Sequence, residues 1–162
     1  MYELIKKINS PQDLKNFSLD EMNDLADEIR EALFNRLTKI GGHFGPNFGI
    51  VEAEIALHYV FNSPIDQFVF DVSHQSYPHK ILTGRKAGYI YDEHFLEDSG
   101  YTNPDESEHD LFNVGHTSTS VSLASGLVKA RDLKGEKRNV IALIGDGSLS
   151  GGEAMAALNV AG

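Results

Sequence analysis

The sequence has no cysteine and no tryptophan, and acidic residues outnumber basic ones. The absence of cysteine excludes disulfide bonds, thiolate zinc sites and cysteine nucleophiles. Lysine and arginine total 14 against 24 aspartates and glutamates, which gives a formal net charge of −10. Proteins that bind nucleic acid by neutralising its phosphates are typically basic, so we expect no nucleic-acid partner.

Long apolar runs and a secretion signal are also missing. No stretch approaches the roughly 20 apolar residues that a membrane span needs. The opening segment MYELIKKINS contains no apolar signal core. We therefore expect a cytoplasmic protein with no membrane contact. With 162 residues, 41% of them hydrophobic, the chain is long enough for one domain with a buried core.

The first clear element is a long helix. Residues 1–17 carry little hydrophobic pattern and are expected to form an N-terminal arm on the surface, ahead of a domain that spans 18–162. Ser18 and Glu21 have the spacing of a capping box. Behind them, apolar residues recur every three or four positions: Met22, Leu25, Ala26, Ile29, Leu33, Leu37 and Ile40. This spacing predicts a helix over 19–40, ended by the glycine pair that follows.

Two short apolar segments, 67–72 and 139–144, are expected to be strands buried on both sides. Further helices are predicted around and after them, at 50–61, at 115–134 and from about 151 onward. The helix at 50–61 is nearly apolar all round and is therefore expected to be buried. The polar segment 86–110 is expected to be a surface loop. This alternation predicts an α/β fold, a parallel sheet with helices on both faces. Two strands are too few for a finished sheet, so we expect the chain to be part of a larger protein.

The sharpest chemical signal is VIALIGDGSLSGG at 140–152, where a buried strand delivers Asp146 to its carboxyl end between two glycines. Ligands of open α/β sheets bind at this edge, and a helix N-terminus there favours phosphate. A carboxylate beside a phosphate suits Mg²⁺. The alternative, more frequent for an isolated Gly-Asp-Gly, is a tight turn in which Asp146 caps the last helix.

A second candidate segment is NVGHTSTS at 113–120, where hydroxyl side chains follow Gly115 at an expected helix start. These groups suit either donation to a diphosphate or ordinary helix capping.

The seven histidines form a third signal, since all lie between His43 and His116. His43 lies in the glycine-rich loop GGHFGPNFG, and His74 and His79 follow the first predicted strand, where imidazoles suit proton transfer near neutral pH. For each histidine alone, a structural, hydrogen-bonded imidazole is the commoner role. No spacing matches a zinc site. His58, within an apolar helix, is expected to be a core residue.

Five segments occur in a family-specific order: GGHFGPNFG, ALHYVFN, DQFVFDVSHQSYPHKILTGR, VGHTSTS and IGDGSLSGGEAMAALNVAG. The chain thereby resembles the N-terminal part of the 1-deoxy-D-xylulose-5-phosphate synthase family, thiamine-diphosphate enzymes related to transketolase. HQSYPHKILTGR is the most specific of these motifs. The resemblance covers about residues 18–162, except for the segment 86–104. It implies a transketolase-like pyrophosphate-binding domain that is incomplete at its C-terminus.

The resemblance also implies an activity. The full-length protein would condense pyruvate with glyceraldehyde 3-phosphate, release CO₂ and form 1-deoxy-D-xylulose 5-phosphate for isoprenoid and thiamine synthesis. Its cofactors would be thiamine diphosphate and Mg²⁺, and it would be a homodimer. Asp146 would bind the metal, and His43 and His74 would be catalytic. The cofactor would be bound by residues of three segments: His74, Gly115, His116, Thr117, Gly147 and Ser148.

The chain departs from the family pattern in several respects. Ser73 replaces the glycine of DVGHQ, and the segment before Glu106 lacks the usual tryptophan-containing stretch. The asparagine that completes the metal site and the glutamate that activates the cofactor belong to later parts of such polypeptides, and Asn159 is not that asparagine. We expect the chain to be inactive without the remainder of the polypeptide or its cleaved C-terminal piece. The alternatives are transketolase-like ketol transfer from another donor, and a non-catalytic fragment that binds a partner.

Overall fold

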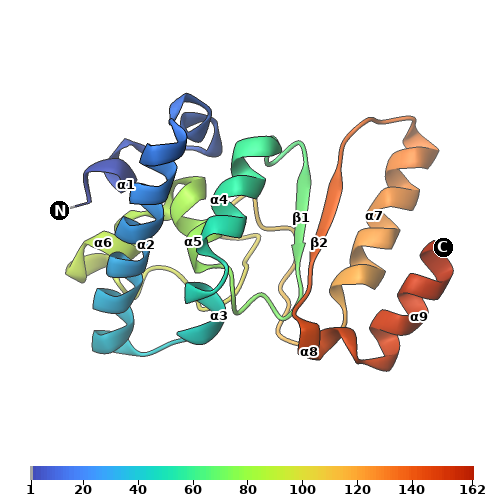
Figure 1. Cartoon of the computed structure of the whole chain (residues 1–162). Coiled ribbons are helices and arrows are strands. Elements are labelled where there is room, and N and C mark those ends of the chain that lie inside the picture. Colours follow the sequence, from blue (N-terminus) through green and yellow to red (C-terminus); the bar gives the residue numbers. More distant parts are fainter. Residues whose placement is uncertain (1) are drawn as a thin grey trace. The chain divides into compact units, whose positions relative to one another are not determined.

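The computed structural model describes residues 2–162, which form two compact units. Unit 1 is the part of the chain up to Asn62 together with His74–Gly100, and unit 2 is Ser63–Ser73 together with Tyr101–Gly162. The sequence indicated one domain and gave no sign of this division. Figure 1 shows the helices and strands along the chain.

Unit 1 is helical. Its elements are α1 (Glu3–Lys7), the 3₁₀ helix η1 (Pro11–Asn16), α2 (Leu19–Ile40), α3 (Gly45–Phe48), α4 (Val51–Val60), α5 (Tyr77–Lys80), the irregular turn η2 (Ile81–Arg85), α6 (Ala87–Ile90) and the 3₁₀ helix η3 (Asp92–His94). Unit 2 contains β1 (Gln67–Phe70), α7 (Ser120–Lys134), β2 (Val140–Leu143), α8 (Asp146–Leu149) and α9 (Gly152–Ala161).

The predicted helix over 19–40 is confirmed as α2. The backbone N–H of Glu21 donates to Ser18 Oγ at 3.2 Å, and the N–H of Ser18 donates to the Glu21 carboxylate at 2.8 Å, so the capping box is formed. Five residues of the predicted apolar stripe are buried in α2: Leu25, Ala26, Ile29, Leu33 and Leu37. Ala32 and Arg36 complete the buried face, whereas Ile40 of the stripe is 40% exposed. Both ends of the helix and its core face therefore follow from local sequence.

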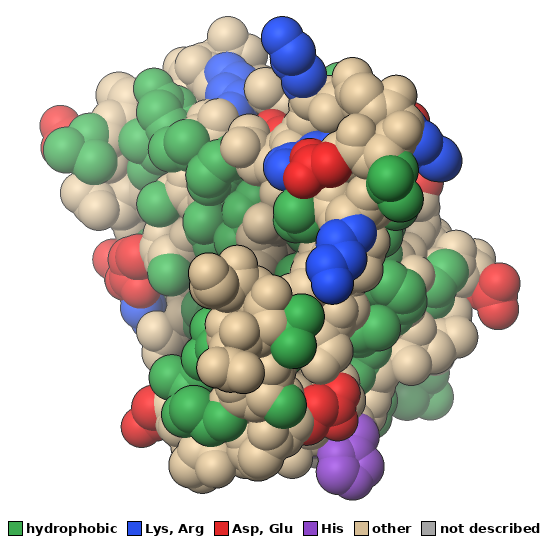
Figure 2. Space-filling model, turned by 90° about the vertical axis from the view of Figure 1, so that its right-hand side faces the viewer, with side chains coloured by type: hydrophobic (Ala, Val, Ile, Leu, Met, Phe, Trp, Pro, Cys, Tyr) green, Lys and Arg blue, Asp and Glu red, His purple; other side chains and the backbone are tan. Residues whose placement is uncertain are grey.

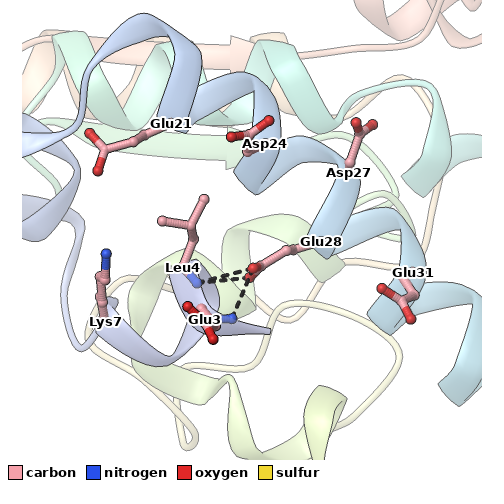
Figure 3. A pocket seen from close by; sticks show the side chains of 8 residues that line it. All are labelled: Glu3, Leu4, Lys7, Glu21, Asp24, Asp27, Glu28 and Glu31. Atoms are coloured by element: carbon pink, nitrogen blue, oxygen red, sulfur yellow. Dashed lines mark hydrogen bonds between the residues drawn. The ribbon is translucent and has the colours of Figure 1, made fainter. Parts of the chain in front are cut away.

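The expected surface position of the N-terminal arm is wrong for the described residues. Ile5, Ile8 and Leu14 are fully buried in the core of unit 1. The carboxylate of Glu28 in α2 accepts the backbone N–H groups at the start of α1, at 2.8 Å from Glu3 and 2.9 Å from Leu4 (Figure 3). The segment is too short to show a hydrophobic period, and its docking depends on a partner more than twenty residues away.

The predicted helix at 50–61 is confirmed as α4, but it is buried on one face only. Val51 and Ile55 are buried, whereas Tyr59 and Val60 on the other side are 39% and 63% exposed. The expectation of burial all round is therefore wrong.

The segment 86–110 is also more ordered than a surface loop. It contains α6 and η3, and Tyr89 and Phe95 are buried. Arg36 of α2 is 3% exposed, donates to the backbone carbonyl of Phe95 at 2.9 Å and lies 4.6 Å from the centre of the Tyr89 ring. Farther along, Asp110 is buried and accepts the N–H of Asn103 at 2.8 Å. The polar composition of this segment gave no indication of these long-range contacts.

Unit 2 contains a two-stranded parallel sheet, which confirms both predicted strands. Their expected burial holds for β1 but not for β2, in which Val140, Ile141 and Ala142 are only partly buried. Phe68 pairs with Ile141, and Phe70 with Leu143. Asp66 fixes this register, because its carboxylate accepts the backbone N–H of Asn139 at 2.8 Å just before β2. The carboxyl ends of both strands therefore lie at one edge, where the sequence placed the candidate site.

Helix α7 packs on this sheet, and α9 packs on α7 (Figure 1). The surface of unit 2 also carries apolar side chains. Met155 and Val160 of α9 are 50% and 65% exposed, and Figure 2 shows hydrophobic groups over this side. Within residues 2–162, no helix combines the length and hydrophobicity of a membrane span.

Candidate functional site

In unit 1, His43 and His74 lie next to each other. His43 follows the end of α2 in the glycine-rich loop, and His74 precedes α5. Their ring centres are 5.4 Å apart at an angle of 80°, and both side chains are half-buried. Nδ1 of His43 lies 3.3 Å from the Tyr77 hydroxyl. The two histidines that the sequence predicted to be catalytic are thus brought together, with a buried tyrosine beside them.

The glycine-rich loop approaches this tyrosine closely. Gly42 has a φ of 135°, and a Cβ at this position would lie 2.5 Å from Leu37 Cδ2 and 3.0 Å from the Tyr77 hydroxyl. Only glycine fits that conformation and that space. The absence of a side chain at Gly42 therefore leaves room for the hydroxyl next to His43.

In unit 2, Asp146 is the first residue of α8, at the carboxyl end of β2. Its side chain is exposed, and within residues 2–162 its carboxylate makes no hydrogen bond or ion pair. The N-cap position of α9 is Gly151, which provides no side-chain cap. Gly145 has a φ of −72°, outside the left-handed region. The alternative of a left-handed turn with Asp146 capping the last helix is therefore not what the structure shows.

The exposed segment 115–117 precedes α7 and is not part of it, so the predicted helix start at 115 is wrong. Helix α7 begins at Ser120, after Ser118 in the left-handed conformation with a φ of 71°. The backbone N–H groups of Ser118 and Ser120 donate to the carboxylate of Asp71 at 2.9 and 3.0 Å. These two donors are therefore already occupied and are not available to a diphosphate.

Asp71 is a residue that the sequence analysis missed. It follows β1 at the same sheet edge as Asp146 and is 1% exposed. Burial acts to raise its pKa, but hydrogen bonds from the backbone of Ser120 and Ser118 and from the Ser148 hydroxyl outweigh burial. The pKa of Asp71 therefore lies below its ordinary value, and the group is a carboxylate at neutral pH.

The segments around Ser118 and Ser148 also touch directly. Ser118 Oγ donates to the backbone carbonyl of Ser148 at 2.7 Å. A Cβ on Gly151 would lie 1.9 Å from Ser118 Oγ, so the approach requires glycine there. Ser118 directly follows the segment 115–117, so this bond brings the end of that segment next to Ser148 within unit 2.

These residues fit a Mg²⁺–diphosphate group better than a metal site built by protein alone. Within residues 2–162, no three histidine, aspartate or glutamate side chains are grouped to hold a metal ion. Mg²⁺ is commonly bound through one or two carboxylates while phosphate oxygens supply other ligands. Asp146 offers one unpartnered carboxylate, and α9 offers an N-terminus without a side-chain cap. The remaining ligands would then come from the diphosphate and from elsewhere in the polypeptide.

The contacts of Ser73 explain why a serine can replace the glycine of the family pattern at this position. Its φ is 69°, a conformation that glycine adopts without strain. The serine hydroxyl donates to the carbonyl of Val114 at 2.9 Å and accepts the N–H of Thr102 at 3.1 Å. The hydroxyl thus ties two parts of the 101–114 segment to the end of β1, which offsets the backbone strain.

A buried polar cluster joins α4 and α5. His58 is 1% exposed, which confirms it as a core residue, and its Nε2 lies 2.9 Å from Nδ1 of the fully buried His79. Glu54, one turn before His58, is also 1% exposed. Burial raises the pKa of Glu54 well above its ordinary value, and the nearby backbone N–H of His79 offsets this only in part. Glu54 is therefore a buried acid that favours its neutral form.

Glu54→Gln is expected to stabilise the protein at alkaline pH. As the pH rises above roughly 4.3, the unfolded glutamate loses its proton while the buried one retains it, so folding stability falls with rising pH. The neutral amide removes this penalty and keeps the shape. We expect a free energy of unfolding about 1–3 kcal/mol above wild type at pH 8 and a smaller difference at pH 4, measured by urea denaturation.

Glu52→Gln on the same helix is the matched control. Glu52 is exposed and forms an ion pair with Arg30 at 2.5 Å, so its loss should cost at most about 1 kcal/mol. A Glu54→Gln variant less stable than wild type at pH 8 would contradict the expected penalty.

Comparisons with known proteins agree with the motif order. A family model described as 1-deoxy-D-xylulose-5-phosphate synthase matches residues 5–162. The chain is 51% identical over 156 residues to the 1-deoxy-D-xylulose-5-phosphate synthase of Caldanaerobacter subterraneus subsp. tengcongensis, covering 96% of this chain and 25% of that protein. It is 53% identical over 159 residues to the synthase of Dictyoglomus thermophilum, covering 98% of this chain and 26% of that protein.

The synthase of Pelotomaculum thermopropionicum is 49% identical over 162 residues, covering 100% of this chain and 25% of that protein. The chain thus spans about a quarter of the length of these curated relatives. Since the family model covers nearly all of the sequence, the chain belongs to the 1-deoxy-D-xylulose-5-phosphate synthase family.

Proposed function

We propose that the full-length protein condenses pyruvate with glyceraldehyde 3-phosphate, releases CO₂ and forms 1-deoxy-D-xylulose 5-phosphate. The observation that carries this proposal is the family match over residues 5–162, with relatives of that name about 50% identical over nearly the whole chain. The cofactors are thiamine diphosphate and Mg²⁺. The protein is a cytoplasmic homodimer, and the remainder of the polypeptide, or its cleaved C-terminal piece, supplies the missing site residues.

Unit 2 binds the charged end of the cofactor in this proposal. Asp146 is the metal ligand, supported by its exposed, unpartnered carboxylate at the carboxyl end of β2. The segment 115–117 and the pair Gly147 and Ser148 contact the diphosphate, supported by the hydrogen bond between Ser118 and Ser148 that joins them. Asp71 organises the turn before α7 and does not itself contact the ligand.

Unit 1 contributes the proton-transfer groups. His74 lies against the cofactor and His43 faces the reacting carbons, supported by the 5.4 Å separation of their rings. When bound, thiamine diphosphate supplies a carbanion and an electron sink for the decarboxylation of pyruvate. The imidazoles hold or move a proton at the oxygen of the reacting carbonyl, a task suited to groups that titrate near neutral pH.

A donor assay tests the proposal. The full-length protein, with thiamine diphosphate and Mg²⁺, is given pyruvate and glyceraldehyde 3-phosphate, and CO₂ and 1-deoxy-D-xylulose 5-phosphate are measured together. We expect one CO₂ for each product molecule. Consumption of a ketose phosphate without CO₂ would instead show transketolase-like ketol transfer. No turnover of either donor would favour the non-catalytic fragment.

A further inference from the structure

The side chain of Asn47 lies at the centre of the two-histidine arrangement in unit 1. It is fully buried, and its Nδ2 donates to the backbone carbonyls of both His43, at 2.7 Å, and His74, at 2.8 Å. Its Oδ1 accepts the backbone N–H of Tyr77 at 2.9 Å. One carboxamide therefore links the glycine-rich loop, the loop before α5 and the first residue of α5.

These bonds use both N–H donors of the carboxamide and one lone pair of its oxygen. Asn47 lies in α3, a helix of four residues, which is too short to fix the loop by itself. The buried hydrogen bonds of Asn47 therefore set the spacing between the backbone of His43 and that of His74.

Tyr77 acts on the ring of His43 rather than on its backbone. The tyrosine is 2% exposed, and its hydroxyl lies 3.3 Å from His43 Nδ1. The guanidinium of Arg36 lies 5.4 Å from the centre of the tyrosine ring and helps to hold it. A phenol hydroxyl can donate to an imidazole nitrogen or accept from it, so this contact orients the His43 ring and biases, through the hydrogen bond at Nδ1, which nitrogen carries the proton.

We propose that Asn47 and Tyr77 are positioning residues, which set the spacing of His43 and His74, orient the His43 ring and bias its tautomer balance. This inference rests on the proposed function, in which both histidines move protons. Rates of such steps depend steeply on placement, and a shift of about 1 Å costs ~100-fold. Neither residue needs to touch substrate or cofactor to have this effect.

The test uses Tyr77→Phe in the full-length protein, since this change removes only one hydroxyl. We expect kcat to fall about 10-fold, the equivalent of one hydrogen bond, while the Kd for thiamine diphosphate stays within about twofold. The nitrogen chemical shifts of the His43 imidazole, assigned by their absence in His43→Gln, should move because the tautomer balance changes.

Tyr89→Phe is the matched control. Tyr89 is fully buried, its ring centre lies 5.8 Å from that of Tyr77, and its hydroxyl has no hydrogen-bond partner among residues 2–162. We expect this variant to keep wild-type kcat and wild-type His43 shifts. Asn47→Asp, which removes both donors at constant shape, should lower kcat by ~100-fold with little change in cofactor Kd.

If Tyr77→Phe leaves either kcat or the His43 shifts at their wild-type values, the proposal is wrong. The same holds if Tyr89→Phe lowers kcat as much as Tyr77→Phe, because the effect would then reflect core packing alone. If the wild-type protein turns over neither donor, the proposed function fails. The shift measurement needs no turnover, so it still decides whether Tyr77 sets the tautomer of His43.

Discussion

Asp146→Ala in the full-length protein is expected to weaken Mg²⁺-dependent binding of thiamine diphosphate by at least about 100-fold in Kd. The carboxylate is exposed and unpartnered within residues 2–162, so its loss should change the free energy of unfolding by less than about 0.5 kcal/mol. A substitution that weakens cofactor binding without lowering stability is the result expected for a metal ligand. Isothermal titration and thermal unfolding of the same preparation measure both quantities.

Glu108→Gln provides the control for this experiment, because Glu108 is another exposed carboxylate in unit 2 and lies outside the segments assigned to the cofactor. It should bind the cofactor as wild type does. If Asp146→Ala also binds normally in the presence of Mg²⁺, Asp146 is not the metal ligand. If it lowers both affinity and stability, the residue has a structural role that its exposure does not indicate.

Asp71→Ala is expected to lower the free energy of unfolding by about 2–4 kcal/mol. The variant leaves the buried N–H groups of Ser118 and Ser120 without their acceptor and removes the negative charge at the start of α7. Urea denaturation measures the global effect. Hydrogen exchange in peptides that cover α7 should rise as well, because the helix loses its N-terminal anchor.

The contribution of Asp71 should also depend on pH. Its pKa in the folded protein is lowered, so the stability it provides is present above the pKa of the unfolded aspartate, about 3.9, and is lost as the pH falls through the folded pKa. The difference between wild type and Asp71→Asn should therefore shrink from pH 6 toward pH 3. Asp105→Asn, at an exposed carboxylate of unit 2, should stay within about 0.5 kcal/mol of wild type throughout. A pH-independent difference would contradict this account.

Elements with local signals were predictable. Helix α2 was predicted at about its observed position because a capping box opens it, an apolar stripe runs along it and glycine ends it. The strands β1 and β2 were found because each is a short, continuously apolar segment, although only β1 is largely buried. Elements held by distant partners were not found. Helix α1 depends on Glu28, and the segment around Phe95 depends on Arg36, so neither leaves a pattern in its own sequence.

The residues of the candidate site also differ in whether their local sequence identifies them. Asp146 and the glycine-rich loop were identified because glycine, a carboxylate and a strand end form a recognisable local pattern. Asp71 gives that same signal, a carboxylate directly after a buried strand, and could have been found by it. Asn47 and Tyr77 gave none, because their importance lies in bonds to backbone groups and to one histidine ring.

In the proposed function, the edge of the sheet in unit 2 binds a diphosphate through Mg²⁺ and Asp146. The most direct measurement is titration of the full-length wild-type protein with thiamine diphosphate, once with Mg²⁺ and once with EDTA. We expect saturable heat with Mg²⁺ and none above background with EDTA. Absence of binding with Mg²⁺, or equal binding in EDTA, would contradict it.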